Sequence, residues 1–149
     1  MPTVTIVVPT AGRVALTRTC LESIQTASSA DGVQVEVLIV DSSSLLEQTH
    51  LHAICAQLGA EFLTGPPSVS DKRNLGAEQA RAELVMFVDS DCVVGPGCLA
   101  AHLATLQQPA VHASQGTILF RGLERLAFRA VRCSGILSAF TPPAARAVA

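Results

Sequence analysis

The sequence predicts a single α/β domain with a mostly parallel central sheet and helices on both of its faces. Short apolar segments rich in β-branched residues alternate along the chain with longer segments whose apolar residues recur at helical spacing. The short segments are continuously apolar, which is typical of strands that are buried on both faces. Together these observations indicate a parallel sheet in which each strand is followed by a covering helix.

The first half of the chain contains three expected strands and two expected helices. The segment TVTIVV is β-branched and ends at Pro9, and the apolar run VEVLIV ends at Asp41. Between them, Leu16, Cys20 and Ile24 recur at helical spacing. The expected strands are residues 3–8, 35–40 and 60–63, and the expected helices are residues 15–26 and 45–58.

The second half is expected to continue this alternation after the loop GPPS. Ser70 or Asp71 can cap a third helix, because both side chains accept hydrogen bonds from the backbone of a first helical turn. The turn sequence GPG separates the next strand from a fourth helix. The expected strands are residues 84–88 and 111–120, and the expected helices are residues 70–82, 98–106 and 123–140.

The composition is that of a globular protein of one domain's length. Of 149 residues, 49% are hydrophobic and 15% are charged, which allows a well-filled core. The chain has five Phe and neither Tyr nor Trp, so stacking on bases is limited and we expect no nucleic-acid partner. Five cysteines without a CxxC pair indicate reduced thiols, and with no signal peptide or long apolar run we expect a cytoplasmic protein.

Charge is distributed unevenly along the chain. Residues 1–91 carry five basic and eleven acidic side chains, a net charge of −6, whereas five arginines against Glu124 give residues 92–149 a net charge of +4.

The division that we expect is an α/β core, residues 1–120, followed by a basic amphipathic helix and tail, residues 121–149, that begins an acceptor region. A stripe on this helix consists of Arg121, Arg125, Arg129 and Arg132. Residues 121–140 suit peripheral contact with the inner face of a membrane, or alternatively pack on the sheet with their arginines in water.

Polar and charged residues follow three of the expected strands. PTAGR comes at the end of the first strand, Asp41 after the second and DSD after the fourth. In a parallel α/β sheet, ligands bind where the strands end. One edge of the sheet is therefore expected to gather an arginine, three carboxylates and several hydroxyl groups.

Asp89 and Asp91 lie two positions apart directly after a buried strand. Ionised carboxylates this close repel each other, and burial increases the cost. A divalent cation removes both penalties, and Mg²⁺ or Mn²⁺ typically takes one or two carboxylates together with phosphate oxygens and water. In the alternative interpretation, Asp89 caps the next helix and Asp91 is simply solvated.

Lys72 and Arg73 lie in the first turn of the third expected helix. The helix dipole disfavours cations at this end, so a cation there often has an anionic partner, and a diphosphate is one candidate. The alternative is an exposed basic pair on the helix surface.

The dinucleotide fingerprint GxGxxG, the P-loop GxxxxGK[ST] and the nucleophile elbow GxSxG are all missing. The segments TVTIVVPTAGR, VEVLIVDSSS and KRNLGAEQARAELVMFVDSD instead resemble family 2 glycosyltransferases of the GT-A fold, a single Rossmann-like domain. Their order and spacing match that family's P-T/S-x-x-R, V-D-D-G-S, A-R-N-x-G and D-x-D segments over residues 3–107. The resemblance implies a nucleotide-diphosphate sugar donor, with a UDP-sugar favoured over a GDP-sugar, and Mn²⁺ or Mg²⁺ as cofactor.

The resemblance also implies roles for individual residues. The residues implied to bind the nucleotide sugar are Pro9, Thr10, Arg13, Asp41, Arg73, Asn74 and Asp89. Those implied to bind the metal are Asp89 and Asp91. Asp41 would contact the base or ribose, and Asp91 would hold the metal that bridges the diphosphate. The cation would then neutralise charge on the leaving nucleoside diphosphate while an unknown acceptor attacks the sugar, with inversion.

Several positions depart from the family pattern. Ala11 stands where an aromatic residue is common, and Ser42 and Ser43 replace the second aspartate and the glycine of V-D-D-G-S. Only one carboxylate, Glu124, follows Asp91, so the catalytic base is unknown and we expect the chain to be the donor-binding portion of a larger enzyme. A nucleotide-sugar-binding module without catalysis is the main alternative. A nucleotidyltransferase, which would need a basic glycine-rich loop after the first strand, is the other.

Overall fold

The computed structural model describes residues 3–118, in which four strands and four helices alternate strictly along the chain. The strands are β1 (Val4–Thr10), β2 (Val35–Asp41), β3 (Glu61–Thr64) and β4 (Val85–Phe87). The helices are α1 (Val14–Asp31), α2 (Leu45–Leu58), α3 (Val69–Gln79) and α4 (Cys98–Leu106). The predicted α/β class is confirmed.

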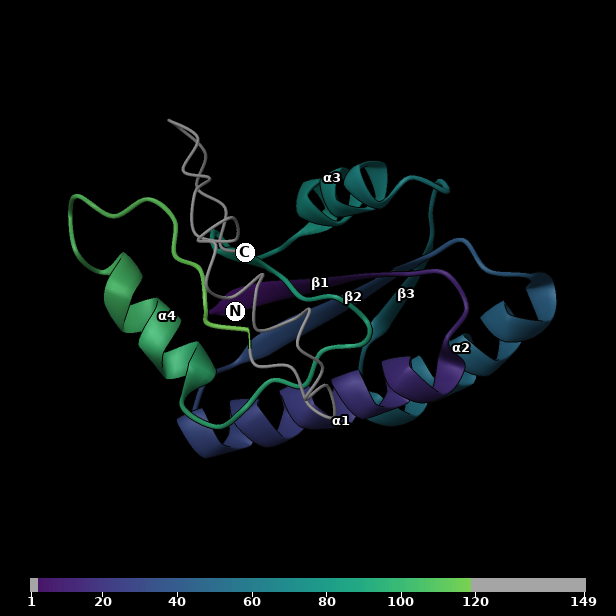
Figure 1. The fold of residues 1–149 in the computed structure, drawn as a ribbon, viewed down its shortest axis with the longest axis horizontal. Helices are drawn as coiled ribbons and strands as arrows, with labels where there is room; N and C mark the ends of the chain where they lie inside the picture. The colour runs from purple at the N-terminus through teal and green to yellow at the C-terminus, as the bar shows by residue number, and fades with distance from the viewer. Residues whose placement is uncertain (1–2, 119–149) are drawn as a thin grey trace, which may run out of the picture.

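The four strands form one parallel sheet in the order β3-β2-β1-β4 (Figure 1). The register of β1 on β2 sets Thr10 opposite Asp41, and the register of β2 on β3 sets Asp41 opposite Thr64. Strands β1, β2 and β3 therefore end at one edge of the sheet. This is the edge at which the sequence predicts a ligand site.

Helices cover both faces of the sheet (Figure 1). Alternate residues of β1 point to opposite faces, so Ile6 and Val8 pack on one side and Val7 on the other. The larger core contains Leu21 of α1 together with buried residues of α2 and α4. The smaller core, on the opposite face, contains Val7 and packs against Leu75 of α3.

Helix α3 lies unusually close to the sheet because its inward face carries Gly76. A Cβ atom on Gly76 would overlap the side chain of Val7, and a Cβ on Gly65, just before the helix, would lie 2.5 Å from Val40 Cγ1. These glycines allow close packing of helix on strand. The start of α3 is thereby held against the carboxyl ends of β1 and β2.

Two predictions for the second half of the chain differ from the structure. The third helix begins earlier than predicted, since Ser68 is its N-cap and its hydroxyl accepts a hydrogen bond from Asp71 N at 3.3 Å. It also ends at Gln79 instead of residue 82. The predicted strand 111–120 is wrong over its described part, because residues 111–118 belong to neither a helix nor a strand. Polar residues and Gly116 interrupt the apolar pattern there.

The remaining strand and helix predictions are confirmed to within a few residues. The first helix is longer than expected and continues to Asp31, where Gly32 adopts the left-handed conformation that ends it. The predicted helix 123–140, with its arginine stripe, lies outside the described residues. None of the described helices combines the length and the apolar character needed to cross a membrane.

Candidate functional site

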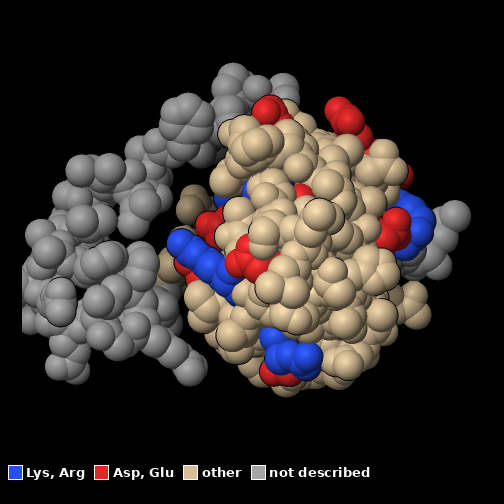
Figure 2. Space-filling view, turned by 90° about the vertical axis from the view of Figure 1, so that its right-hand side faces the viewer, with Lys and Arg blue, Asp and Glu red and all other residues tan. Residues whose placement is uncertain are grey.

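A hollow of about 350 Å³ opens at the carboxyl edge of the sheet. Three chain segments surround it: the end of β1 with the loop into α1, the start of α3, and the turn after β4. Its lining residues are Pro9, Thr10, Ala11, Arg13, Pro67, Val69, Lys72, Arg73, Asp89, Ser90 and Asp91. Figure 2, which views this edge of the sheet, shows basic and acidic side chains side by side on a surface that is otherwise mostly uncharged.

The first charged pair in the hollow joins the β1–α1 loop to the turn after β4. Arg13 Nη1 donates to Asp91 Oδ2 at 2.8 Å, and both side chains are about half exposed. Arg13 has φ 57°, a left-handed conformation that is costly for a residue with a Cβ, and it stands at the N-cap of α1 without a side-chain cap. The loop therefore holds Arg13 in an unfavourable backbone conformation that directs its guanidinium to Asp91.

The second charged pair joins α3 to the same turn. Arg73 Nη2 donates to Asp89 Oδ1 at 2.7 Å, and the guanidinium carbon lies 5.9 Å from the centre of the Phe87 ring. Arg73 Nε is buried and has no hydrogen-bond partner among residues 3–118. One guanidinium thus contacts both the aromatic end of β4 and the first aspartate of the D-x-D segment.

Lys72 is buried, with 1% of its surface exposed. Its Nζ donates to the backbone oxygen of Thr10 at 2.7 Å, across the interface between α3 and the end of β1. The alternative of an exposed basic pair at positions 72 and 73 is therefore wrong for Lys72. The sequence could not reveal this burial, because it depends on how closely α3 approaches the sheet.

Asp41 lies beside the hollow without lining it. Its carboxylate is fully buried and accepts hydrogen bonds from Ser43 N at 2.8 Å and from Ser43 Oγ at 2.5 Å. Ser43 Oγ in turn accepts from Gly12 N at 2.5 Å, so Asp41 and Ser43 connect the β2–α2 loop to the β1–α1 loop. In this arrangement the carboxylate of Asp41 supports the loop that carries Arg13.

Asn74 is the second nucleotide-binding candidate, after Asp41, that is not part of the lining of the hollow. It is exposed on α3 and does not line the hollow. The other candidates from β1, α3 and the D-x-D turn, namely Pro9, Thr10, Arg13, Arg73, Asp89 and Asp91, all line it. Their roles in binding remain predictions.

The turn that carries the two aspartates is anchored to α1 by residues that the sequence pattern did not single out as functional. Asp89 O accepts from Cys92 N at 2.9 Å and from Cys20 Sγ at 3.7 Å, and Ser23 Oγ accepts from Val94 N at 3.0 Å. Burial, and after it the neighbouring Cys92, Asp91 and Asp89, raise the pKa of the Cys20 thiol to about 12. Cys20 is therefore a neutral donor that helps to hold the turn.

The alternative in which Asp89 caps the next helix is wrong. The carboxylate near the start of α4 is that of Asp31, which accepts from Gly97 N at 2.6 Å and from Ala100 N at 3.1 Å. These hydrogen bonds lower the pKa of Asp31. Asp89 is left to face the hollow.

The chemistry of Asp89 and Asp91 fits a hard divalent cation. Both offer carboxylate oxygens to one hollow, and Mg²⁺ or Mn²⁺ commonly uses only one or two protein carboxylates. Across residues 3–118 there is no cluster of three or more His, Cys, Asp or Glu side chains that could hold a cation unaided. Such a cation would take its other ligands from phosphate oxygens and water.

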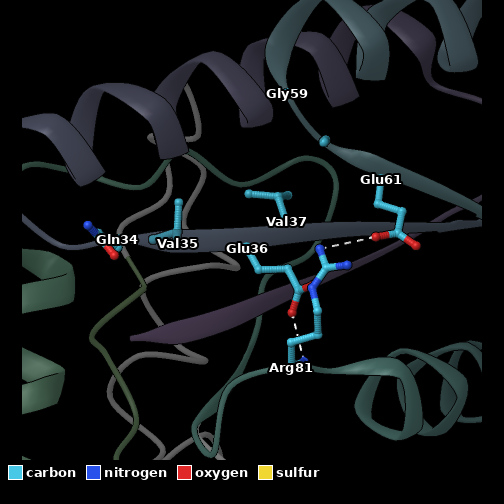
Figure 3. Close-up of a pocket in the computed structure, with 8 residues that line it drawn as sticks. Gln34, Val35, Glu36, Val37, Gly59, Glu61 and Arg81 are labelled. Carbon is cyan, nitrogen blue, oxygen red and sulfur yellow. Dashed lines mark hydrogen bonds and ion pairs between the residues drawn. The ribbon is translucent and has the colours of Figure 1, made fainter. Parts of the chain in front are cut away.

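A second hollow, of about 770 Å³, lies at the amino ends of β2 and β3 (Figure 3). Its charged residues pair with one another: Arg81 Nε lies 2.5 Å from Glu36 Oε1, and Arg81 Nη2 lies 3.3 Å from Glu61 Oε2. Glu36 Oε2 also accepts from Thr5 Oγ1 at 2.5 Å and from Arg81 N at 2.8 Å. This cluster holds the segment after α3 against the sheet. Because the charged groups of this second hollow bind one another, they are structural, and we assign the functional site to the hollow at the carboxyl edge.

The parallel sheet and the paired aspartates at its carboxyl edge define a Rossmann-like domain of the GT-A type. The sequence matches the family model described as glycosyl transferase family 2 over residues 5–143. The match covers most of the chain, and the chain belongs to glycosyl transferase family 2. The resemblance that the sequence segments indicated is thus confirmed.

Three similar solved structures are of TarS from S. aureus. TarS 1-349 has a TM-score of 0.62 at 21% identity, and the match covers 83% of this chain and 38% of that one. A second TarS structure gives 0.57 at 21% identity, covering 81% and 23%, and TarS 1-349 in complex with UDP gives 0.59 at 20% identity, covering 83% and 38%. These likenesses show the fold, and this chain spans well under half the length of each TarS chain. No curated protein matches the sequence significantly.

Proposed function

We propose that this chain binds a nucleotide-diphosphate sugar in the hollow at the carboxyl edge and serves as the donor site of a glycosyltransferase. The observation that carries the proposal is the side-by-side arrangement of Asp89 and Asp91 with three cations around one hollow, in a chain of glycosyl transferase family 2. Carboxylates suit a divalent cation, and cations suit a diphosphate. The hollow combines both requirements.

In this proposal Asp89 and Asp91 hold Mg²⁺ or Mn²⁺, which when bound supplies positive charge to stabilise the diphosphate as it leaves. Pro9 and Thr10 lie against the nucleotide, and Asp41 keeps the adjoining loops in register through Ser43. Arg13 and Arg73 orient the two aspartates through their ion pairs. Asn74 lies on α3 outside the lining of the hollow, so in this proposal it contacts a part of the nucleotide that extends beyond the hollow.

The reaction proposed is a direct displacement with inversion at the sugar. An acceptor oxygen forms a bond to the anomeric carbon while the bond from that carbon to the diphosphate oxygen breaks. The electron pair of the broken bond leaves with the nucleoside diphosphate, and the acceptor proton passes to a base. In this proposal both aspartates of the hollow hold the cation, so the base is a different group.

A UDP-sugar is the first candidate donor and a GDP-sugar the second. The support for uridine is that TarS 1-349, whose fold is similar, has been solved in complex with UDP. The presence of Ala11 in the lining, where the family often has an aromatic residue, removes one stacking surface for the base. Both nucleotides therefore belong in the test.

The test is release of nucleoside diphosphate from UDP-sugars and GDP-sugars in the presence of Mn²⁺, with water as the default acceptor. Wild-type protein is compared with Asp91→Asn and with the matched control Asp71→Asn, which removes an exposed carboxylate from the first turn of α3 outside the hollow. We expect slow hydrolysis that Asp91→Asn abolishes and Asp71→Asn preserves. Binding without hydrolysis would favour the non-catalytic binding module, and absence of binding would contradict the proposal.

A further inference from the structure

We infer that Lys72 is a diphosphate-binding residue. The negatively charged diphosphate of the donor is the counter-ion of its buried ammonium group. This inference rests on the proposed function, because it assigns one group of that site to one part of the donor. The observations that carry it are the burial of Lys72, its hydrogen bond to Thr10 O and the pairing of every other charge in the hollow.

Within residues 3–118, Lys72 has one hydrogen-bond partner for its three N–H bonds. Its Nζ donates to Thr10 O at 2.7 Å, and no ion pair within 4.0 Å of it occurs among the residues that the structure describes. An ammonium group buried with a single carbonyl partner is costly, because it has lost hydration without gaining a counter-ion. A chain that keeps a charge at such a position is expected to gain a counter-ion from a ligand.

The nearby carboxylates do not supply that counter-ion. Asp89 and Asp91 form ion pairs with Arg73 and Arg13. Along β2, Val37 and Ile39 face the larger core while Leu38 and Val40 face α3, so Asp41 points to the face away from α3, where its carboxylate accepts from Ser43 N. Among the residues of the described part of the chain, the ammonium group of Lys72 is thus the charge of the hollow that has no counter-ion.

The charge of the whole hollow agrees with this assignment. Three cations and two carboxylates line it, which leaves a net charge of +1 that is not cancelled within the lining. A nucleotide-diphosphate sugar is anionic, and the nucleoside diphosphate that leaves carries one further negative charge in place of the bond to the sugar. A fixed buried cation therefore favours the departing diphosphate over the intact donor.

Lys72 is the sole lysine of the chain, which makes the inference directly measurable. Lysine-selective ¹³C labelling gives one side-chain signal set, so an NMR titration of the wild-type protein with UDP or GDP in the presence of Mg²⁺ reports on this residue alone. Uridine, which has the base and ribose without phosphate, is the control ligand. We expect the diphosphates to shift the Lys72 signals and uridine to leave them in place.

A matched pair of variants tests the same point by affinity. Lys72→Met keeps the apolar stem and removes the charge, whereas Arg18→Met removes one charge from the exposed surface of α1. We expect Lys72→Met to weaken nucleoside diphosphate binding by about tenfold or more, the loss typical of one hydrogen bond to a charged group, with uridine binding unchanged. Arg18→Met should bind both ligands as the wild type does.

The outcomes separate the inference from the proposed function. If the wild type binds diphosphates and the Lys72 signals do not move, or Lys72→Met binds them with unchanged affinity, Lys72 is a structural residue and this inference is overturned while the donor site stands. If the wild type binds neither UDP nor GDP, both are overturned. Should Lys72→Met fail to fold, the NMR titration of the wild type still decides.

Discussion

Arg13 and Asp91 are 78 positions apart in the chain and form an ion pair at 2.8 Å across the mouth of the hollow. The pair joins the loop after β1, which is predicted to bind the nucleotide sugar, to the D-x-D turn after β4, which is predicted to bind the metal. Because both side chains are about half exposed, the pair itself contributes only about 0–1 kcal/mol to stability. The main effect of the ion pair is therefore to hold these two segments of the site together, and its contribution to the stability of the fold is small.

The left-handed conformation of Arg13 leads to the first prediction. Arg13→Gly and Arg13→Ala both remove the ion pair, but only Gly adopts φ 57° without strain. We expect the glycine variant to be more stable than the alanine variant by about 1 kcal/mol in chemical denaturation. Equal stabilities would mean that the backbone at position 13 relaxes out of the left-handed region.

The close approach of α3 to the sheet leads to the second prediction. Gly76→Ala adds a Cβ that overlaps Val7, so we expect a loss of about 1–3 kcal/mol in the free energy of unfolding. Adding Val7→Ala should recover part of the loss, because it removes the overlapping methyl groups. Gly95→Ala is the control, since a Cβ there meets no atom within 4 Å. A tolerated Gly76→Ala would contradict the packing described for α3.

The cluster at the amino edge of the sheet leads to the third prediction. Glu36 is 7% exposed and accepts hydrogen bonds from Thr5 and from the backbone of Arg81, in addition to its ion pair with the Arg81 side chain. Glu36→Gln removes the charge that these donors share, and we expect a loss of about 1–3 kcal/mol in unfolding experiments. Nucleotide affinity should stay unchanged, because the cluster lies at the opposite end of the strands. A specific loss of nucleotide binding would move the functional site to the hollow of Figure 3.

The carboxylate near the start of α4 leads to a prediction about pH. Hydrogen bonds from Gly97 N and Ala100 N lower the pKa of Asp31, so the folded state binds this proton less tightly than the unfolded state. The resulting stabilisation is present above the unfolded pKa of about 3.9 and is lost as the pH falls through the lower folded pKa. In thermal unfolding, Asp31→Ala should therefore melt below the wild type at pH 7, and the gap should narrow in strong acid. A gap independent of pH would show that the carboxylate charge is not involved.

Much of the fold follows from local patterns in the sequence. Continuous apolar runs such as VEVLIV and helical spacing such as that of Leu21 and Ile24 are properties of neighbouring residues, and they predicted the order of strands and helices. The strand predicted over 111–120 is wrong over residues 111–118, because a local pattern cannot show whether a neighbouring strand is there to pair with it.

Less of the site could be predicted, because its contacts join residues far apart in the chain. The sequence identified the strand ends that gather Arg13, Asp89 and Asp91, since carboxyl ends of parallel strands meet at one edge, and it placed Arg73 in the first turn of the third helix. It could not show that Arg13 pairs with Asp91, because this contact depends on how two loops fold toward each other. Nor could it show that Arg73 pairs with Asp89 or that Lys72 is buried against Thr10, because these contacts depend on how closely α3 packs on the sheet.

The central claim is that Asp91 holds a divalent cation through which the donor diphosphate binds. The most direct measurement is calorimetric titration of UDP and GDP, with and without Mn²⁺, on the wild type, on Asp91→Ala and on the control Asp71→Ala. We predict that at least one nucleotide binds the wild type and the control only when Mn²⁺ is present, and that Asp91→Ala weakens this binding by about tenfold or more. Binding that needs no metal, or that Asp91→Ala leaves unchanged, would contradict the claim.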